Sequence, residues 1–381
     1  QPIKDLSVTG SYSYEYTGQS VKTMPVFNDI WNFGTDQIMF YGEGQSYITQ
    51  KQYDRERNYM DVVANYSHRF LEDRLGLQAM VGASQEQYQY EWHTVSRKDL
   101  TAPNGSVLDA ANGEISANGN RTQWVMRSYF GRINLDWENK YLAEFNLRSD
   151  GSSRFLSAHR WGYFPSGSLA WRIDQEAFME DAEWLDNLKI RASYGALGNN
   201  SVGNYSAISS YGAANYILNN AVNTGWSITA LANANLTWEK TKVTDIGFDF
   251  GVLNNRLYGT FDWFNKQTEG ILIQLPSPLV HGAATTPTSN AAQVTNKGFE
   301  VSLGWRDQIN DFSYSINGNY TYVTNNVDKF KGKDRSLDGI YLTQEGEAIG
   351  SMYMYEADRI IQTDEDLAIV NNMIARNPDA V

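Results

Sequence analysis

The residues of this chain that could do chemistry are carboxylates set between apolar neighbours. Glu144, Asp262 and Glu300 each have an apolar residue on both sides, so in a strand all three would project from the polar face. Glycoside hydrolysis needs two carboxyl groups that flank one sugar. Nothing in the sequence pairs these three, and isolated charges on the polar face of a sheet are ordinary. We therefore expect that the chain is not an enzyme.

Other reactive or metal-binding patterns are also missing from the sequence. The chain has no cysteine, which excludes thiol nucleophiles, disulfides and zinc-thiolate sites. The histidines lack the spacing of metal ligands. They are His68, His93, His159 and His281. The glycine-rich stretch "GALGNNSVGNY" lacks the spacing of a phosphate-binding loop and reads as the flexible base of a loop. No metal or cofactor is expected.

The acidic run from Asp364 to Asp366 lacks the spacing of a calcium loop. Thr363 before it is a good helix N-cap, and acids in a first turn suit the helix dipole. We predict a helix that begins after Thr363.

Composition bounds the class of protein. The 381 residues include 24 Tyr, 11 Trp, 16 Phe and 31 Gly, a mixture that suits strands and turns. The net charge is -13, with 31 Lys plus Arg against 44 Asp plus Glu, so nucleic-acid binding is not expected. No run approaches the roughly 18 apolar residues of a membrane helix.

Alternation of apolar and polar residues is the main structural signal. In "YLAEFNLRSDGSSRF" it places Tyr141, Phe145 and Leu147 on one face and Asn146 and Arg148 on the other. The same pattern predicts about twelve strands. They lie near 4–17, 58–70, 75–92, 121–137, 141–150, 160–173, 188–198, 237–252, 256–270, 297–306, 312–324 and 350–360. A soluble sheet and a membrane barrel both show this alternation, so single strands do not separate them.

The connections favour the barrel. Short polar turns, "LEDR", "ENK", "LNNR" and "DQIND", alternate with long connections near 18–57, 93–120, 199–236, 271–296 and 325–349. One connection on the short-turn side, "DQEAFMEDAEWLDN", is expected to form a short helix. Tight turns on one rim and long loops on the other are the plan of an outer-membrane barrel. Trp137 and Tyr141 flank one tight turn, and Trp305 and Phe312 flank another, where a barrel would meet the lipid headgroups. The alternative for these aromatic residues is cross-strand pairing in a soluble sheet.

Six segments in order resemble the barrel of SusC/RagA-type TonB-dependent transporters. The resemblance covers most of Tyr129 to Thr363, whereas residues 1–120 match in pattern more than in sequence. The segments are "YLAEFNLRSDGSSRF", "WGYFPSGSLAWRIDQEAFM", "WLDNLKIRASYGALGNNSVGNY", "NLTWEKTKVTDIGFDFGVLNNRLYGTFDWFNKQTEGIL", "NKGFEVSLGW" and "EGEAIGSMYMYEADRIIQT".

The resemblance implies an all-β, antiparallel transmembrane barrel of about 22 strands in the bacterial outer membrane, with a plugged lumen. It also implies import of oligosaccharides or peptides, energy relayed by TonB, and a SusD-like surface lipoprotein as a lid. No plug domain or TonB box is recognisable, so residues 1–381 are expected to be a barrel segment. A passive porin and a soluble all-β glycan-binding or glycan-cleaving protein are the alternatives.

Candidate site residues follow from this plan. Apolar strand positions, such as Phe145, Leu147, Trp171, Ile190, Phe248 and Val301, are predicted to contact lipid. Loop residues predicted to contact cargo are Trp31, Trp92, Trp226 and His281; the alternative is that they pack the loops or contact a neighbouring protein. Arg148, Asp150 and Arg154 are predicted to be structural groups that steady a strand end and a plug.

Overall fold

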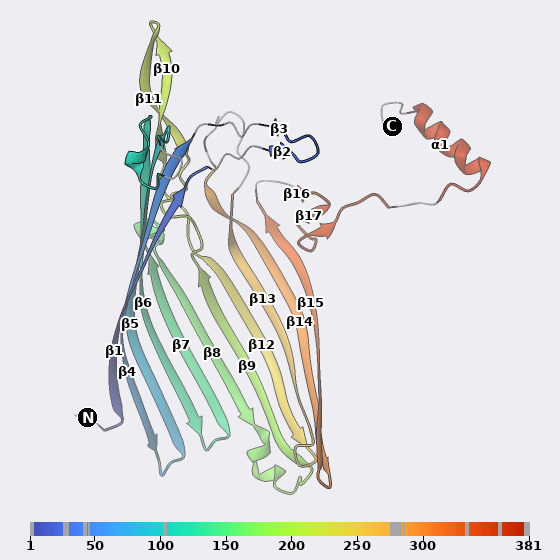
Figure 1. The fold of residues 1–381 in the computed structure, drawn as a ribbon. Coiled ribbons are helices and arrows are strands. Elements are labelled where there is room, and N and C mark those ends of the chain that lie inside the picture. The colour runs from blue at the N-terminus through green and yellow to red at the C-terminus, as the bar shows by residue number, and fades with distance from the viewer. Residues whose placement is uncertain are drawn as a thin grey trace.

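The main feature of the structure, a computed structural model, is one antiparallel sheet of eleven strands (Figure 1). The structure describes residues 4–25, 30–40, 44, 46–101, 105–274, 284, 286–331, 335–356 and 360–376. The sheet strands are β1 (Leu6–Thr23), β4 (Tyr47–Phe70), β5 (Leu75–Lys98), β6 (Ile115–Trp137), β7 (Tyr141–Ser152), β8 (Trp161–Arg172), β9 (Leu185–Asn199), β12 (Glu239–Val252), β13 (Leu257–Gln274), β14 (Thr288–Ile309) and β15 (Phe312–Phe330). Each pairs with the next in this order, so the sheet is a meander with β1 and β15 at its edges.

Smaller elements lie in the segments that connect the strands of the main sheet or follow its last strand. They are the hairpins β2 (Ile30–Asn32) with β3 (Gln37–Phe40) and β10 (Ser210–Leu218) with β11 (Ala221–Ala230), the small sheet of β16 (Arg335–Asp338), β17 (Tyr341–Gln344) and β18 (Ser351–Met352), the 3-10 turns η1 (Leu108–Ala110), η2 (Ser157–His159), η3 (Ile173–Gln175) and η4 (Ala177–Met179), and helix α1 (Asp364–Arg376). In Figure 1 the β10–β11 hairpin rises at the end of the sheet opposite the tight turns. Among the described residues, no helix has the length and apolar character needed to cross a membrane.

Strand pairing divides the sheet into two faces of opposite character. We call the face of Tyr141, Phe145 and Leu147 the outer face and the face of Glu144, Asn146 and Arg148 the inner face. One row of directly paired residues on the outer face crosses ten strands without a polar interruption. It consists of Phe70, Leu75, Trp137, Tyr141, Trp171, Ile190, Phe248, Phe261, Val301 and Tyr320. The register thus puts all six residues predicted to contact lipid on one face.

The tight turns hold this register. Non-glycine residues at the turns adopt positive φ, between 52° and 69°, as hairpin turns that match strand twist require. They are Leu71, Glu72, Asp73, Glu138, Asn139, Leu253, Asn254, Asn255 and Asn310. Asp and Asn tolerate this conformation better than most residues because their short side chains bond locally. The predicted turn rim is confirmed.

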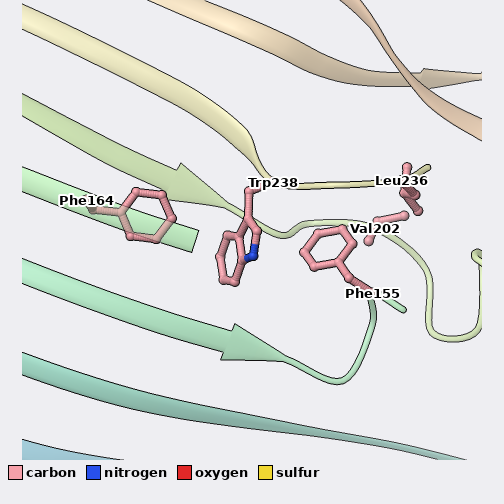
Figure 2. Packing of buried hydrophobic residues seen from close by; sticks show 5 residues of the cluster. All are labelled: Phe155, Phe164, Val202, Leu236 and Trp238. Carbon is pink, nitrogen blue, oxygen red and sulfur yellow. The ribbon is translucent and has the colours of Figure 1, made fainter. Parts of the chain in front are cut away.

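A buried cluster closes the opposite end of the central strands (Figure 2). Trp238 lies with its ring centroid 5.4 Å from those of Phe155 and Phe164, and its indole N–H donates to the Arg160 carbonyl at 3.0 Å. Leu236 and Val202 complete the cluster. Val202 belongs to the glycine-rich stretch that we expected to be a flexible loop base, so this stretch is instead anchored by packing.

Eleven of the twelve predicted strands lie in the main sheet, and the twelfth is wrong. Among the described residues of this segment, 350–356 and 360, only Ser351–Met352 form a strand, and it pairs with β17 rather than with β15. The residues from Met352 to Tyr355 are all apolar or aromatic, so this segment has no polar face. Helix α1 agrees with prediction, because the Thr363 hydroxyl accepts from the Asp366 N–H at 3.2 Å.

One further expectation needs correction, and one is confirmed. β4 begins at Tyr47 rather than near 58, and β5 and β14 are also longer than predicted, so much of the predicted long loops is strand. The expected short helix after β8 is present as two 3-10 helices of three residues each, η3 and η4. The Asp174 carboxylate accepts from the Leu188 N–H at 3.2 Å and from Arg172 at 3.2 Å, which ties this segment back onto β9.

The outer face can be tested at Phe145. Replacing it with arginine in the full-length protein should cost about 2–4 kcal/mol, because a charge on the lipid face near the bilayer midplane loses its hydration. Asn146→Arg is the matched control on the inner face and should cost much less. Urea unfolding in lipid vesicles measures both. Spin labels at the two positions should report lipid and water respectively, and the reverse pattern would overturn the register.

The turn after β8 gives a pH-dependent prediction. The Tyr141 hydroxyl donates to Glu176 at 2.6 Å and the Trp171 indole at 3.0 Å, and together they lower the pKa of Glu176 below its ordinary 4.5. A lowered pKa stabilises the fold above that ordinary value, and the contribution is lost as pH falls through the lowered pKa. Glu176→Gln should therefore reduce the urea midpoint at neutral pH, and the difference from the parent should shrink in acid.

Glu180→Gln, in the same segment, is the control for this pH dependence. Its carboxylate forms no hydrogen bond or ion pair with any part of the chain that the structure describes. A difference between Glu176→Gln and the parent that stays constant with pH would contradict the prediction.

Candidate functional site

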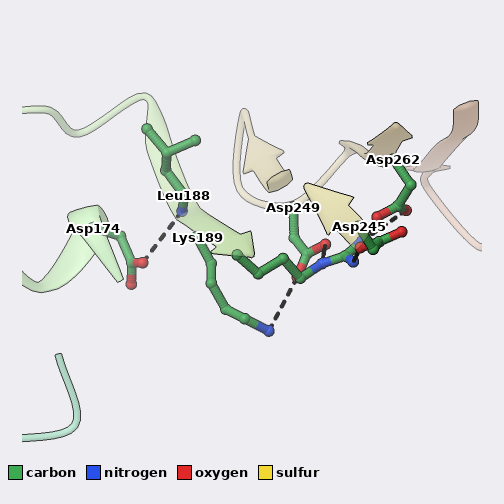
Figure 3. A network of polar contacts seen from close by, with 7 residues as sticks. Asp174, Leu188, Lys189, Asp245, Asp249 and Asp262 are labelled. Carbon is green, nitrogen blue, oxygen red and sulfur yellow. Dashed lines mark hydrogen bonds and ion pairs between the residues drawn. The ribbon is translucent and has the colours of Figure 1, made fainter. Parts of the chain in front are cut away.

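The inner face has a charged region near the tight turns and an aromatic region near the long connections. The charged region centres on Arg191 of β9, which contacts three aspartates of β12 and β13. Figure 3 labels these aspartates and the neighbouring Lys189. The Arg191 guanidinium lies 2.5 Å from Asp262, 3.1 Å from Asp249 and 3.4 Å from Asp245. Lys189 reaches Asp249 at 3.1 Å. Three carboxylates thus share two cations on one wall.

This region borders a polar groove of about 500 Å³ that runs across the inner face from β4 to β12. Charged residues from several strands line it, among them Arg69, Asp136, Glu144, Arg191 and Asp245. Glu144 accepts a hydrogen bond from the Asn146 side chain at 2.7 Å, and Asp262 is engaged by Arg191. Two of the three carboxylates considered for glycoside hydrolysis, Glu144 and Asp262, are therefore parts of polar networks.

The aromatic region arises from a change in the sequence of β5. In "LGLQAMVGASQEQYQYEW", from Leu75 to Trp92, the outer positions are apolar as far as Ala83 and then become Gln85, Gln87, Gln89 and Glu91. About ten residues are enough for a strand to cross the hydrocarbon layer, so the outer face becomes polar where the strand leaves the membrane. The aromatic residues Tyr88, Tyr90 and Trp92 stand beyond this point and on the inner face.

Neighbouring strands add rings and charges to these residues. Tyr88 stacks with Trp124 of β6 at 5.8 Å between ring centroids, and Tyr90 stacks with Tyr53 of β4 at 6.4 Å. The Arg57 guanidinium lies 2.7 Å from the Glu86 carboxylate. A pocket of about 350 Å³ opens between these groups. It is lined by Glu15, Thr17, Arg55, Arg57, Glu86, Tyr88 and Trp124.

The predicted structural residues form two separate contacts. Arg148 donates to Asp150 at 2.8 Å and to the Ser128 hydroxyl at 2.9 Å within the sheet. Arg154 donates to Asn204 at 3.0 Å and to the Asn200 carbonyl at 3.0 Å, and lies 5.1 Å from the Trp124 ring centroid. Burial lowers the pKa of Arg154. Arg154 thus ties the loop after β9 to the aromatic region, while contact with a plug stays a prediction.

The residues predicted to contact cargo lie on different elements. Trp92 is half-buried on the inner face of β5, Trp31 is on β2, and Trp226 is on β11 with 73% of its surface exposed. His281 lies outside the described residues. Sequence reasoning missed Tyr53, Tyr88 and Trp124, although the change in β5 from apolar outer positions to aromatic inner positions was a signal that could have found Tyr88.

Comparison with known families agrees with this architecture. Residues 2–348 match the family described as TonB dependent receptor-like, beta-barrel. The chain belongs to this family. Membership of the TonB-dependent receptor family confirms the predicted all-β barrel fold and the location in the bacterial outer membrane. The expectation that the chain is not an enzyme agrees with a family of receptors.

Individual relatives support the more specific resemblance. TonB-dependent receptor P39 of Formosa agariphila is 31% identical over 321 residues, which cover 83% of this chain and 30% of the relative. TonB-dependent receptor SusC of Bacteroides thetaiotaomicron is 34% identical over 237 residues, which cover 60% of this chain and 23% of the relative. The chain thus spans less than a third of these relatives, and its predicted likeness to SusC/RagA-type receptors is confirmed.

A solved structure of the RagAB peptide transporter shares the fold. It superposes with a TM-score of 0.80 at 23% identity, over 91% of this chain and 38% of the other. At this identity the likeness concerns the fold alone.

The charged region gives a stability prediction. Arg191→Met should destabilise the full-length protein by roughly 2 kcal/mol, because it leaves three neighbouring aspartates without their shared donor. Asp262→Asn in the same background should recover part of the loss by removing one of the repelling charges. Urea unfolding followed by tryptophan fluorescence measures each variant. Lys189→Met, which removes one ion pair, is the control, and an equal cost for it would contradict a central role for Arg191.

Proposed function

We propose that this chain forms part of the wall of a TonB-dependent importer that moves oligosaccharides or peptides across the outer membrane. The observation that carries the proposal is the division of the sheet in a member of this family: an apolar outer face, and an inner face that is polar near the turns and aromatic near the long connections. A cargo path needs water and polar groups inside, and lipid contact only outside.

The plug, the TonB-interacting segment and further barrel strands are proposed to lie outside these 381 residues. The chain spans 23% to 30% of the two relatives described above, which leaves room in such proteins for these parts. The charged inner region supports a plugged lumen, because the groove beside Arg191 offers a plug both anionic and cationic partners. TonB would act through the plug.

A SusD-like surface lipoprotein is the proposed partner at the rim of long connections. The β10–β11 hairpin projects from that rim with large apolar residues on its surface (Figure 1). Ile217, Val222 and Trp226 each expose more than 70% of their surface. A protein partner that covers them would remove this apolar surface from water. Trp31, Trp92 and His281 remain proposed cargo contacts, whereas for Trp226 the exposed hairpin favours the alternative, contact with a neighbouring protein.

Energised uptake is the test of this function. Cells that express the full-length protein should accumulate its labelled cargo, and deletion of tonB should reduce accumulation to background because passage depends on energy from TonB. Affinity purification from native membranes should recover the barrel together with a surface lipoprotein. Uptake that persists without TonB would instead support a passive porin. Purification of the barrel without a lipoprotein would contradict the proposal of a lipoprotein lid.

A further inference from the structure

The aromatic residues of β5 stand where neither lipid nor a hydrophobic core requires them. The outer face of the strand has already become polar at Gln85, so Tyr88, Tyr90 and Trp92 lie beyond the part of the strand that meets acyl chains. Strand alternation turns all three toward the inner face, where they remain half-buried. Rings that face a water-filled passage with part of their surface free are suited to contact what moves through it.

The pocket among these rings combines stacking surfaces with hydrogen-bonding groups. Tyr88 and Trp124 present two rings 23° from parallel, and Arg154 contacts the Trp124 ring and fixes its position. Beside these rings, the Arg57 guanidinium and the Glu86 carboxylate form an ion pair with an N–O distance of 2.7 Å. The Arg57 side chain is 52% exposed and the Glu86 side chain 15%. The guanidinium has further N–H donors and the carboxylate further lone pairs, so the pair can both donate to and accept from one ligand group.

From this arrangement we propose that the inner face of β1, β4, β5 and β6 holds a carbohydrate-binding subsite for a neutral oligosaccharide. Tyr88 and Trp124 pack against the apolar face of a sugar ring, and Arg57 and Glu86 form hydrogen bonds with its hydroxyls. The inference rests on the proposed import function and names the class of cargo. It assigns a role to four residues that belong to three different strands.

The charges of the pocket favour a neutral ligand. Its lining contains two arginines, Arg55 and Arg57, and two glutamates, Glu15 and Glu86, so the formal charges cancel. A site selective for acidic or basic cargo would need an excess of one sign, because specificity for a charged partner comes from complementary potential. Hydroxyl groups, by contrast, use donors and acceptors equally, which is what two arginines and two carboxylates provide.

The spacing along β5 favours an extended ligand. Tyr88, Tyr90 and Trp92 are two residues apart, which places successive side chains on this face about 6.8 Å from one another. Tyr53 of β4 stacks beside Tyr90 and widens the platform. A ligand with several linked rings can contact more than one of these positions at once, so a chain of sugars suits the wall better than a single one.

Binding by purified full-length protein in detergent tests the subsite. The probes are a panel of neutral hexasaccharides with glucose, xylose and mannose backbones, together with uncharged hexapeptides of mixed sequence. The parent should bind at least one hexasaccharide and none of the peptides at this site. Trp124→Ala and Tyr88→Ala should each raise Kd by roughly tenfold or more, the loss expected for one stacked ring. Glu86→Gln should raise it less.

Tyr14→Ala is the matched control. Tyr14 is an exposed tyrosine of β1 on the outer face, in the register row next to that of Glu15 and Arg57, so its loss should leave sugar binding unchanged. Heat-modifiable migration on gels checks that each variant is folded. If Trp124→Ala alone proves misfolded, Trp124→Phe and Tyr88→Leu replace the alanine variants, and the latter should still lose binding.

The outcomes separate this inference from the proposed function. Failure of every hexasaccharide to bind, binding of peptides that depends on Tyr88 and Trp124, or equal sugar affinity in the parent and the ring variants would each overturn the subsite. TonB-dependent uptake is measured on the same variants. Uptake that does not depend on TonB would overturn the import function. The subsite would still be tested by comparing the sugar affinities of the parent and the ring variants.

Discussion

Every structural feature of this chain depends on one constraint, the need to pair backbone N–H and C=O groups where water is absent. An unpaired group in hydrocarbon costs several kcal/mol, so each strand must bond to neighbours along the whole depth of the membrane. The meander meets this demand for every strand between its two edge strands, β1 and β15. Pairing in register then forces side chains of adjacent strands onto common faces, and the row from Phe70 to Tyr320 is the result.

Once lipid occupies one face, the other is free to hold charge. Near the turns this face is held by ion pairs around Arg191, which neutralise most of the carboxylates that β12 and β13 bring together. Further along the strands, outside the membrane, the demand for an apolar outer face ends. There the sequence of β5 reverses its pattern, with glutamines outside and Tyr88 and Tyr90 inside. The same strand thus has an apolar outer face at one end and an aromatic inner face at the other.

Alternation of apolar and polar residues predicted the outer and inner faces of the sheet, because the two sides of each strand meet different solvents. The same pattern predicted eleven strands and the tight turns between them. It failed where that contrast is absent. From Tyr47 to Arg57 both faces of β4 are polar or mixed, so this part of the strand was read as loop. Alternation also could not predict which residues of different strands contact each other. Arg191 and Asp249 stand 58 residues apart, and only the pairing of β9 with β12 places them together.

The turns impose an asymmetry on how such a protein can diversify. A residue added within the turn at Leu71 to Asp73 would shift the next strand by one position and exchange its lipid and water sides. A residue added at the tip of the β10–β11 hairpin, between Leu218 and Ala221, changes no pairing of the main sheet. Changes in length at that hairpin therefore leave the register of the main sheet unchanged, so this rim can gain new surface while the wall keeps its fold.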